Sequence, residues 1–163
     1  MGPLSIPGST RHRALVEKVM SELRALSTVQ DRLDQYAAQR FGLNRTDLRA
    51  LDLVGQAEVL SPTALAEALG MSTGATSTVL DRLEAAGYVR REPDPAHRRR
   101  TVVRMAPRAH EMSEAVFGPV LRGTLDQAAA QPDATLTAVA DFLAGHRELL
   151  NRCLTAARED DGS

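Results

Sequence analysis

Two long stretches of the sequence, one near each end, carry apolar residues at three- and four-residue steps. From residue 10 to about residue 41 neither proline nor glycine interrupts the chain, and the apolar positions are Leu15, Val19, Leu23, Leu26, Leu33 and Ala37. Near the other end the repeat is about 3.5 residues, as in a coiled-coil seam, and its positions are Leu136, Val139, Leu143, His146, Leu150, Cys153 and Ala157. Such spacing places apolar side chains on one face of a helix and therefore predicts two long amphipathic helices.

Between these stretches, capping residues and glycines predict three shorter helices. Asn44 can cap the first of them, directly after Gly42 has ended the long helix. Ser61 and Pro62 form a typical start for the second, because serine accepts backbone N–H groups and proline fits the first helical position. Ser72 can cap the third, which runs to the glycine at position 87.

Two short runs that read as strands follow, YVRRE at 88–92 and RTVVRM at 100–105, joined by a loop that contains proline. Four consecutive basic residues, His97 to Arg100, end this loop and begin the second run. The two runs predict an antiparallel hairpin, and residues 58–60 form a connector that could add a single β bridge. Another helix begins at Pro107 and is expected to break or soften near Gly118, Pro119 and Gly123. The predicted fold is mainly α with a small two- or three-stranded β wing.

Residues 62–81, PTALAEALGMSTGATSTVLD, meet the requirements of a helix-turn-helix. Two helices that cross closely need a small residue at the crossing, which Ala66 provides. The turn needs a residue that is free to take positive φ, and Gly70 stands there. Apolar residues must fill the angle between the helices, and the chain offers Thr76 at one such position beside Leu65, Leu69, Met71 and Val79. An ordinary α-hairpin within a bundle is the alternative interpretation.

The charge of the 163-residue chain is unevenly distributed. Its net charge is −1, yet residues 90–108 contain seven arginines against two acids, a local charge of +5, which leaves −6 for the rest. A basic patch on an otherwise acidic protein is typical of a partner that is a polyanion. Aromatic residues make up only 3% of the chain, so the core must be built from leucine, valine and alanine, as is usual in helical folds.

With these residues in view, the sequence resembles the MarR family of bacterial transcription regulators. The resemblance is carried by LAEALGMSTGATSTVLDRLEAAGYVRR at 65–91 and by DPAHRRRTVV at 94–103. It implies a winged helix-turn-helix with N- and C-terminal dimerisation helices. Two positions depart from the family pattern, because His97 stands at the second acidic position of the wing and Ala106 replaces a small polar residue. In the family the carboxylate helps to brace the wing arginines, so its absence bears on the rigidity of the wing.

The helix that begins after Ser72 is the expected recognition helix. With its apolar residues turned inward, the positions left outward near its N-terminal end are Ser72, Thr73, Gly74, Ser77 and Thr78. In this motif that end enters the major groove, where hydroxyl groups can bond to base edges and threonine methyls can meet thymine. Gly74 permits close approach of the backbone. Capping and solvation are the alternative roles of these serines and threonines.

The wing is expected to contact the DNA backbone and the minor groove. Arg98, at the loop tip, matches the family residue that inserts into the minor groove, where A·T-rich sequence deepens the negative potential. Arg99 and Arg100 are expected to meet phosphates or brace the loop, and His97 adjoins them. Further candidate phosphate contacts are Arg82, Arg90 and Arg91. A solvated charge run is the alternative, although such runs usually alternate in sign.

The apolar stripes of the two long helices have no partner inside a winged-helix core, and exposed apolar surface of that extent is typical of an interface. The resemblance implies a homodimer built through these helices, bound to a pseudo-palindromic operator on double-stranded DNA with recognition helices about 34 Å apart. We therefore expect a disordered N-terminus at 1–9, a dimerisation helix at 10–43, the DNA-binding domain at 44–106 and C-terminal dimerisation helices at 107–163.

The resemblance also implies a repressor that a small aromatic or phenolic effector releases from DNA. Candidate residues for lining an effector pocket are His12, Tyr36 and Phe41, for which ordinary packing is the alternative. An enzyme is not expected, because no convergent catalytic group or phosphate-binding loop is present. The four histidines and Cys153 lack the spacing of a zinc site, so neither a metal nor another cofactor is expected.

The lone cysteine allows no internal disulfide, and no leader-like or membrane-spanning apolar run is present. These features favour a cytoplasmic protein that does not contact a membrane. Two other functions stay open at this point. One is a winged-helix module that binds proteins without contacting DNA, and the other is a metal-sensing winged-helix regulator, which would need paired cysteines or histidines.

Overall fold

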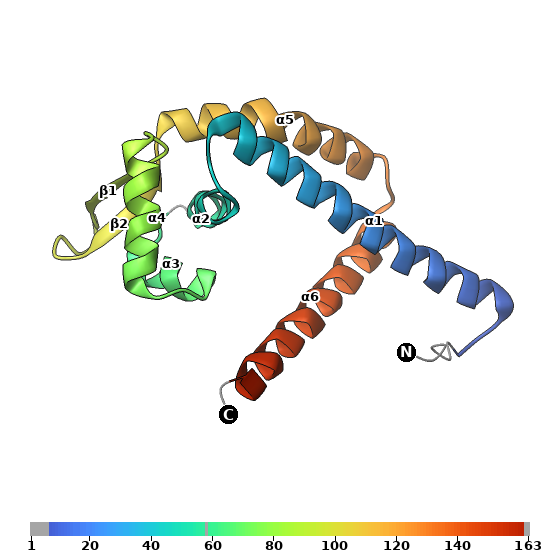
Figure 1. Ribbon diagram of the computed structural model, residues 1–163. Coiled ribbons are helices and arrows are strands. Elements are labelled where there is room, and N and C mark those ends of the chain that lie inside the picture. The colour runs from blue at the N-terminus through green and yellow to red at the C-terminus, as the bar shows by residue number, and fades with distance from the viewer. Residues whose placement is uncertain (1–6, 58, 162–163) are drawn as a thin grey trace. The chain divides into compact units, whose positions relative to one another are not determined.

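A computed structural model of the chain describes residues 7–57 and 59–161, with side chains as far as residue 157 (Figure 1). Residues 1–6 of the predicted disordered N-terminus lie outside the described residues. The chain divides into two units, Met1–Glu114 and Ala115–Ser163. The predicted order of elements is confirmed, and it is α1 (Thr10–Phe41), α2 (Arg45–Gln56), α3 (Pro62–Leu69), α4 (Thr73–Ala85), β1 (Val89–Pro93), β2 (Thr101–Met105), α5 (Pro107–Ala129) and α6 (Asp133–Asp161).

Local capping explains where the first four helices begin. The capping side chain accepts a backbone N–H three residues further on in each case, at 3.2 Å for Ser9, 2.8 Å for Asn44, 3.1 Å for Ser61 and 3.2 Å for Ser72. Two helices end on a glycine in the left-handed region, α1 at Gly42 with φ 66° and α3 at Gly70 with φ 67°. A side chain other than glycine would strain the backbone there.

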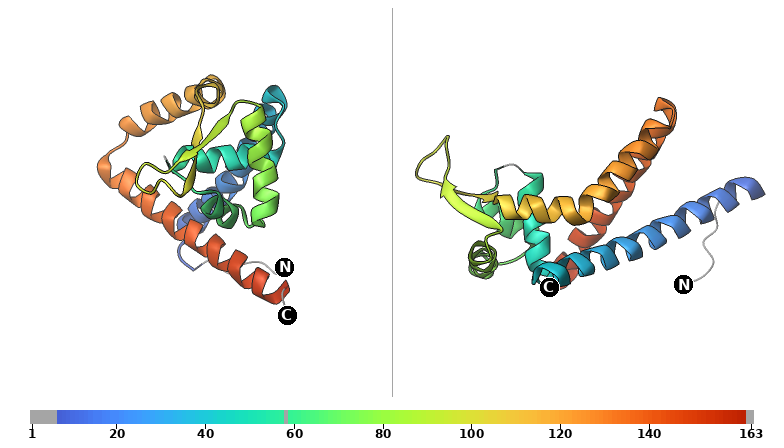
Figure 2. Two further views of the ribbon diagram at one scale, coloured as in Figure 1. Left: turned by 90° about the vertical axis from the view of Figure 1, so that its left-hand side faces the viewer. Right: turned by 90° about the horizontal axis from the view of Figure 1, so that it is seen from above.

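The hairpin pairs β1 with β2 in an antiparallel register that runs from Val89 opposite Met105 to Pro93 opposite Thr101. The N–H of Val103 donates to the carbonyl of Leu60 at 2.8 Å, which makes the single bridge predicted for the connector. The wing is therefore two strands with one added bridge. Its loop extends away from α3 and α4 (Figure 2).

The core of the first unit forms where α2, α3, α4 and the hairpin meet. Its buried side chains include Leu51, Val54, Leu65, Leu80, Leu83, Tyr88 and Val103. β2 packs closely against α2 at Gly55, where an added Cβ would lie 2.7 Å from the Met105 sulfur and the methionine side chain would have to shift. These contacts fix the hairpin against the helix-turn-helix.

The long helices contribute little to this core. In α1 only Ala37 and Ala38 are buried, and leucines such as Leu15 and Leu26 are exposed. In the second unit, α6 buries none of its residues from 133 to 157.

The predicted break near Gly118 and Pro119 is wrong: α5 continues through both as one helix. Proline removes one N–H donor from the helix, but the remaining backbone hydrogen bonds on either side of it keep the helix continuous.

None of the helices in the described part of the chain has an apolar stretch long enough to cross a membrane. Within the same residues, no three histidine, cysteine, aspartate or glutamate side chains come together in a way that could hold a metal ion.

Candidate nucleic-acid interface

Helices α3 and α4 form the predicted helix-turn-helix. Ala66 is buried at the crossing, and its carbonyl accepts the Met71 N–H at 3.0 Å across the turn. Thr76 is buried although it is polar, and its hydroxyl donates to the Ser72 carbonyl at 3.0 Å. A threonine can therefore fill a position that asks for an apolar side chain, because the helix backbone satisfies its one donor.

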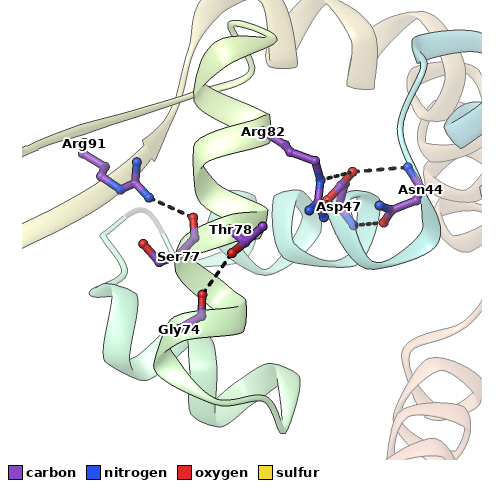
Figure 3. Close-up of polar contacts among 7 residues, drawn as sticks. All are labelled: Asn44, Asp47, Gly74, Ser77, Thr78, Arg82 and Arg91. Carbon is purple, nitrogen blue, oxygen red and sulfur yellow. Dashed lines mark hydrogen bonds and ion pairs between the residues drawn. The ribbon is translucent and has the colours of Figure 1, made fainter.

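The N-terminal part of α4 presents the predicted base-reading residues together. Thr73, Gly74, Ser77 and Thr78 are all exposed, as is Ser72, whose side chain caps the helix. The Thr78 hydroxyl donates to the Gly74 carbonyl at 3.2 Å (Figure 3), which leaves its oxygen free to accept and its methyl free to make apolar contact. The Ser77 hydroxyl forms no hydrogen bond with a described residue.

Gly74 has open space around it. A Cβ built on this residue would meet no heavy atom within 4 Å, and its φ is not in the left-handed region. A glycine in place of alanine inside a helix lowers the stability of that helix by about 0.5–1 kcal/mol. Nothing within the described part of the chain requires a glycine at this position.

The wing loop carries its arginines on a framework built by Asp94. The Asp94 side chain accepts the Ala96 N–H at 2.8 Å, and its backbone N–H donates to the Arg100 carbonyl at 2.8 Å. The Arg100 N–H in turn donates to the His97 carbonyl at 2.7 Å. The residues exposed at the tip are His97, Arg98, Arg99 and Arg100. Backbone turns thus brace the loop although the second acidic residue of the family pattern is missing.

The three arginines from 98 to 100 form no ion pair or side-chain hydrogen bond with any residue that the structure describes. The other predicted phosphate contacts are already engaged. At the root of the wing, Glu92 pairs with one arginine of its own strand and one of the opposite strand: the Arg90 Nε is 3.1 Å from Glu92 Oε2, and Arg104 of β2 pairs with the other oxygen.

Arg82 joins α4 to α2. Its Nη2 lies 2.6 Å from Asp47 Oδ1, and Asp47 is buried and belongs to the capping box of α2 with Asn44 (Figure 3). The hydrogen bond to Asp47 raises the pKa of Arg82 above its ordinary value. Nearly half of the Arg82 side chain stays exposed, so a phosphate contact predicted for it remains sterically possible.

Arg91 lies against the exposed face of α4. Its guanidinium contacts the carboxylates of Asp81 and Glu84 and the Ser77 carbonyl. Sequence reasoning predicted a phosphate contact and missed these partners. The signal for them was present, because Ser77, Asp81 and Glu84 follow the four- and three-residue steps that place side chains on one helical face.

Tyr88 and Arg108 fix the end of α4, and neither was singled out in the sequence. The buried Tyr88 donates its hydroxyl to the Phe41 carbonyl at the end of α1, at 3.1 Å. The Arg108 guanidinium lies 4.8 Å from the centre of the Tyr88 ring and donates to the Ala86 carbonyl at 2.9 Å.

Two of the predicted effector-pocket residues, Tyr36 and Phe41, both contact Arg40. The third, His12, lies about 36 Å from Tyr36 along α1.

Comparison with known proteins decides the family. Residues 41–100 match the sequence model of the MarR family. An uncharacterized HTH-type transcriptional regulator from Bacillus subtilis, YcgE, is 32% identical over 153 residues, which cover 93% of this chain and 99% of that protein. The chain belongs to the MarR family. The resemblance stated from the sequence is confirmed, and the chain is by family a transcriptional regulator and not an enzyme.

Solved structures agree on the fold of this MarR-family chain. Rv1404 from Mycobacterium tuberculosis aligns with a TM-score of 0.59 and 18% identity, over 90% of this chain and 97% of that one. A mutant of MepR from a multidrug-resistant S. aureus clinical isolate aligns with a TM-score of 0.64 and 15% identity, over 81% and 96%. The predicted winged helix-turn-helix fold is confirmed.

Proposed function

We propose that this MarR-family protein is a homodimer that binds a pseudo-palindromic operator on double-stranded DNA in a sequence-specific manner. One observation carries the proposal. The N-terminal face of α4 is exposed and has no acidic side chain from residue 72 to residue 78. The same chain carries three wing arginines that pair with no described residue. Such a pair of surfaces suits a major groove with its adjacent minor groove.

Each residue then has a distinct role in binding. Thr73, Ser77 and Thr78 read base edges in the major groove, and Gly74 lets the helix backbone come close. Arg98 enters the minor groove beside each half-site. Phosphates are met by Arg82, Arg90, Arg99 and Arg100, with His97 at the edge of the loop. This assignment extends the sequence prediction, and what supports it is the exposure of these residues on α4 and the wing.

The dimer is proposed from the apolar faces of the long helices. Leucine and valine side chains that are about half exposed line α1, among them Leu15, Leu26 and Val29. The second unit exposes a similar set on α5 and α6, namely Val120, Leu121, Leu125, Leu136, Val139, Phe142, Leu143, Leu149, Leu150 and Leu154. Exposed apolar faces that run along several helices are typical of an interface, and a second copy of the chain supplies faces of the same kind to cover them.

Repression that is relieved by a small aromatic or phenolic effector is the mode of regulation we propose within this function. The protein would act where the chromosome lies, which in a bacterium is the cytoplasm. The domain limits expected from the sequence, with dimerisation helices at 10–43 and 107–163 around a DNA-binding domain at 44–106, belong to the same proposal.

Enrichment of duplexes from a randomised pool by the purified protein tests the function. If about six phosphates are neutralised, the affinity for an enriched duplex should fall with a log–log salt slope of about −5. Failure to enrich any duplex at low salt would contradict DNA binding and leave a protein–protein module as the function. Enrichment only after a divalent metal ion is added would favour a metal-sensing regulator.

A further inference from the structure

Four hydrogen bonds from Arg91 tie the first strand of the wing to the recognition helix. The backbone N–H donates to Glu84 Oε1 at 3.0 Å, and Nη1 donates to Glu84 Oε2 at 2.6 Å. Nη2 donates to Asp81 Oδ1 at 2.7 Å. It also donates to the Ser77 carbonyl at 3.2 Å, the contact that Figure 3 shows. One residue of β1 thus holds two turns of α4.

The open edge of β1 explains why the backbone takes part. Arg91 lies opposite Val103 of β2, and the Val103 N–H is turned to Leu60 on the other side. The Arg91 N–H therefore points to an edge where the described residues supply no further strand, and the Glu84 carboxylate accepts it instead. This bidentate contact through one carboxylate fixes both the position and the rotation of β1 against α4.

The chemistry of the contacted groups gives the second argument. Asp81 and Glu84 are carboxylates on the helix that would face DNA, and their side chains are 66% and 41% exposed. The hydrogen bonds from the Arg91 backbone and then from its side chain lower the pKa of Glu84. Glu84 therefore carries charge at neutral pH, and hydrogen bonds from a guanidinium to a charged carboxylate are the stronger kind.

We propose that Arg91 is a positioning residue that holds the base-reading face of α4 in fixed register with the wing, and so determines sequence preference without contacting DNA. The inference rests on the proposed function. As a consequence, the Arg91 contact fixes the position of Ser77, which contacts the major groove, relative to Arg98, which contacts the minor groove. A phosphate contact, which the sequence alone suggested for Arg91, is the competing role.

The sign of the charge separates the two roles. Arg91→Ala removes a positive charge, whereas Glu84→Ala removes a negative charge from the same contact. An electrostatic role predicts opposite effects on affinity, because added negative repulsion weakens binding and its removal strengthens it. A positioning role predicts that both variants lose selectivity in the same direction. Arg91→Lys keeps the charge but loses the planar fork, so it should lose selectivity as well.

The test compares two duplexes: one enriched by the parent protein from a randomised pool, and a scrambled duplex of the same composition. The ratio of the two affinities measures selectivity. Arg91→Ala, Arg91→Lys and Glu84→Ala should each lower this ratio by about tenfold, the size expected for one hydrogen bond to a charged group. The salt slope of Arg91→Ala should equal that of the parent. Thermal unfolding of each variant shows that it is folded, and Arg91→Lys carries the test if Arg91→Ala is not.

Two matched controls fix the scale. Glu67→Ala removes an exposed carboxylate from α3 and should leave the ratio unchanged. Arg90→Ala should weaken both duplexes equally and reduce the salt slope by about 0.9, as loss of one phosphate contact does. If Arg91→Ala behaves like Arg90→Ala, or if Glu84→Ala strengthens binding with its ratio unchanged, the inference is wrong. A parent that enriches no duplex overturns the proposed function itself, which is a different result.

Discussion

Asp47 and Arg82 join α2 to α4 across 35 residues of sequence, with Asp47 Oδ1 2.6 Å from Arg82 Nη2. The same carboxylate accepts the Asn44 N–H at 3.4 Å and so completes the capping box at the start of α2. One buried side chain therefore both begins a helix and holds the recognition helix in place.

Asp47→Ala should lower the free energy of unfolding by about 1–3 kcal/mol, because it removes a helix-capping contact together with an ion pair. Urea denaturation followed by circular dichroism measures this. Arg82→Ala should also lower the denaturation midpoint, because it leaves a buried carboxylate without its partner. If Arg82→Ala leaves the midpoint unchanged and weakens only DNA binding, Arg82 is a phosphate contact and not a structural one.

Gly74→Ala should raise the stability of the protein by up to about 1 kcal/mol, since alanine is the better helix former and the space around Gly74 is open. The same change should weaken binding to the enriched duplex, because the added methyl group lies where DNA must approach. Gly145→Ala is the matched control, also in a helix with open space. It should gain stability and keep DNA affinity. Equal DNA affinity for Gly74→Ala and the parent would exclude close approach at this residue.

Leu143→Glu should dissociate the dimer, because it places a charge in the predicted seam of α6. Leu143 is about half exposed in one chain, so the change should have little effect on a folded monomer. Sedimentation velocity measures the mass. Asp141→Lys is the control, since two residues back along a helix is about 160° away around its axis. An unaltered dimer in Leu143→Glu would place the interface on another surface.

Asp34 gives a pH-dependent prediction. Partial burial, and then repulsion from Asp52 and Asp31, raises the pKa of this carboxyl group in the folded protein. A group whose pKa is raised by folding stabilises the protein below its unfolded pKa, and this contribution is lost as the pH rises through the folded pKa. Asp34→Asn should therefore be more stable than the parent at pH 7, by a few tenths of a kcal/mol. This advantage should disappear near pH 3, and an advantage that persists there would contradict the assignment.

Local chemistry made much of the fold predictable from the sequence. The starts of the helices at Asn44, Ser61 and Ser72, and the turn at Gly70, depend on residues within four positions of each other. The exposed faces of α4 and the wing follow from helical and strand periodicity. The break predicted at Pro119 is wrong because a proline removes only one backbone hydrogen bond, and the remaining hydrogen bonds of α5 keep the helix continuous.

The contacts that hold the site together were not predictable in the same way. Arg82 with Asp47 and Tyr88 with Phe41 join residues 35 and 47 positions apart. Their geometry depends on how helices pack, which periodicity does not give. Arg91 was assigned to phosphate from its charge. Helical spacing places Asp81 and Glu84 on one face of α4, but only the structure shows that β1 lies beside that face.

Hydroxyl-radical footprinting of the enriched duplex tests the central claim most directly. We expect protection at two half-sites about one helical turn, or 34 Å, apart, each flanked by a protected stretch of minor groove. Arg98→Ala should lose the minor-groove protection and keep the half-sites, with binding weaker by about 1–3 kcal/mol. A single unpaired half-site, or protection that is the same with and without the Arg98 side chain, would contradict a dimer that reads DNA through α4 and the wing.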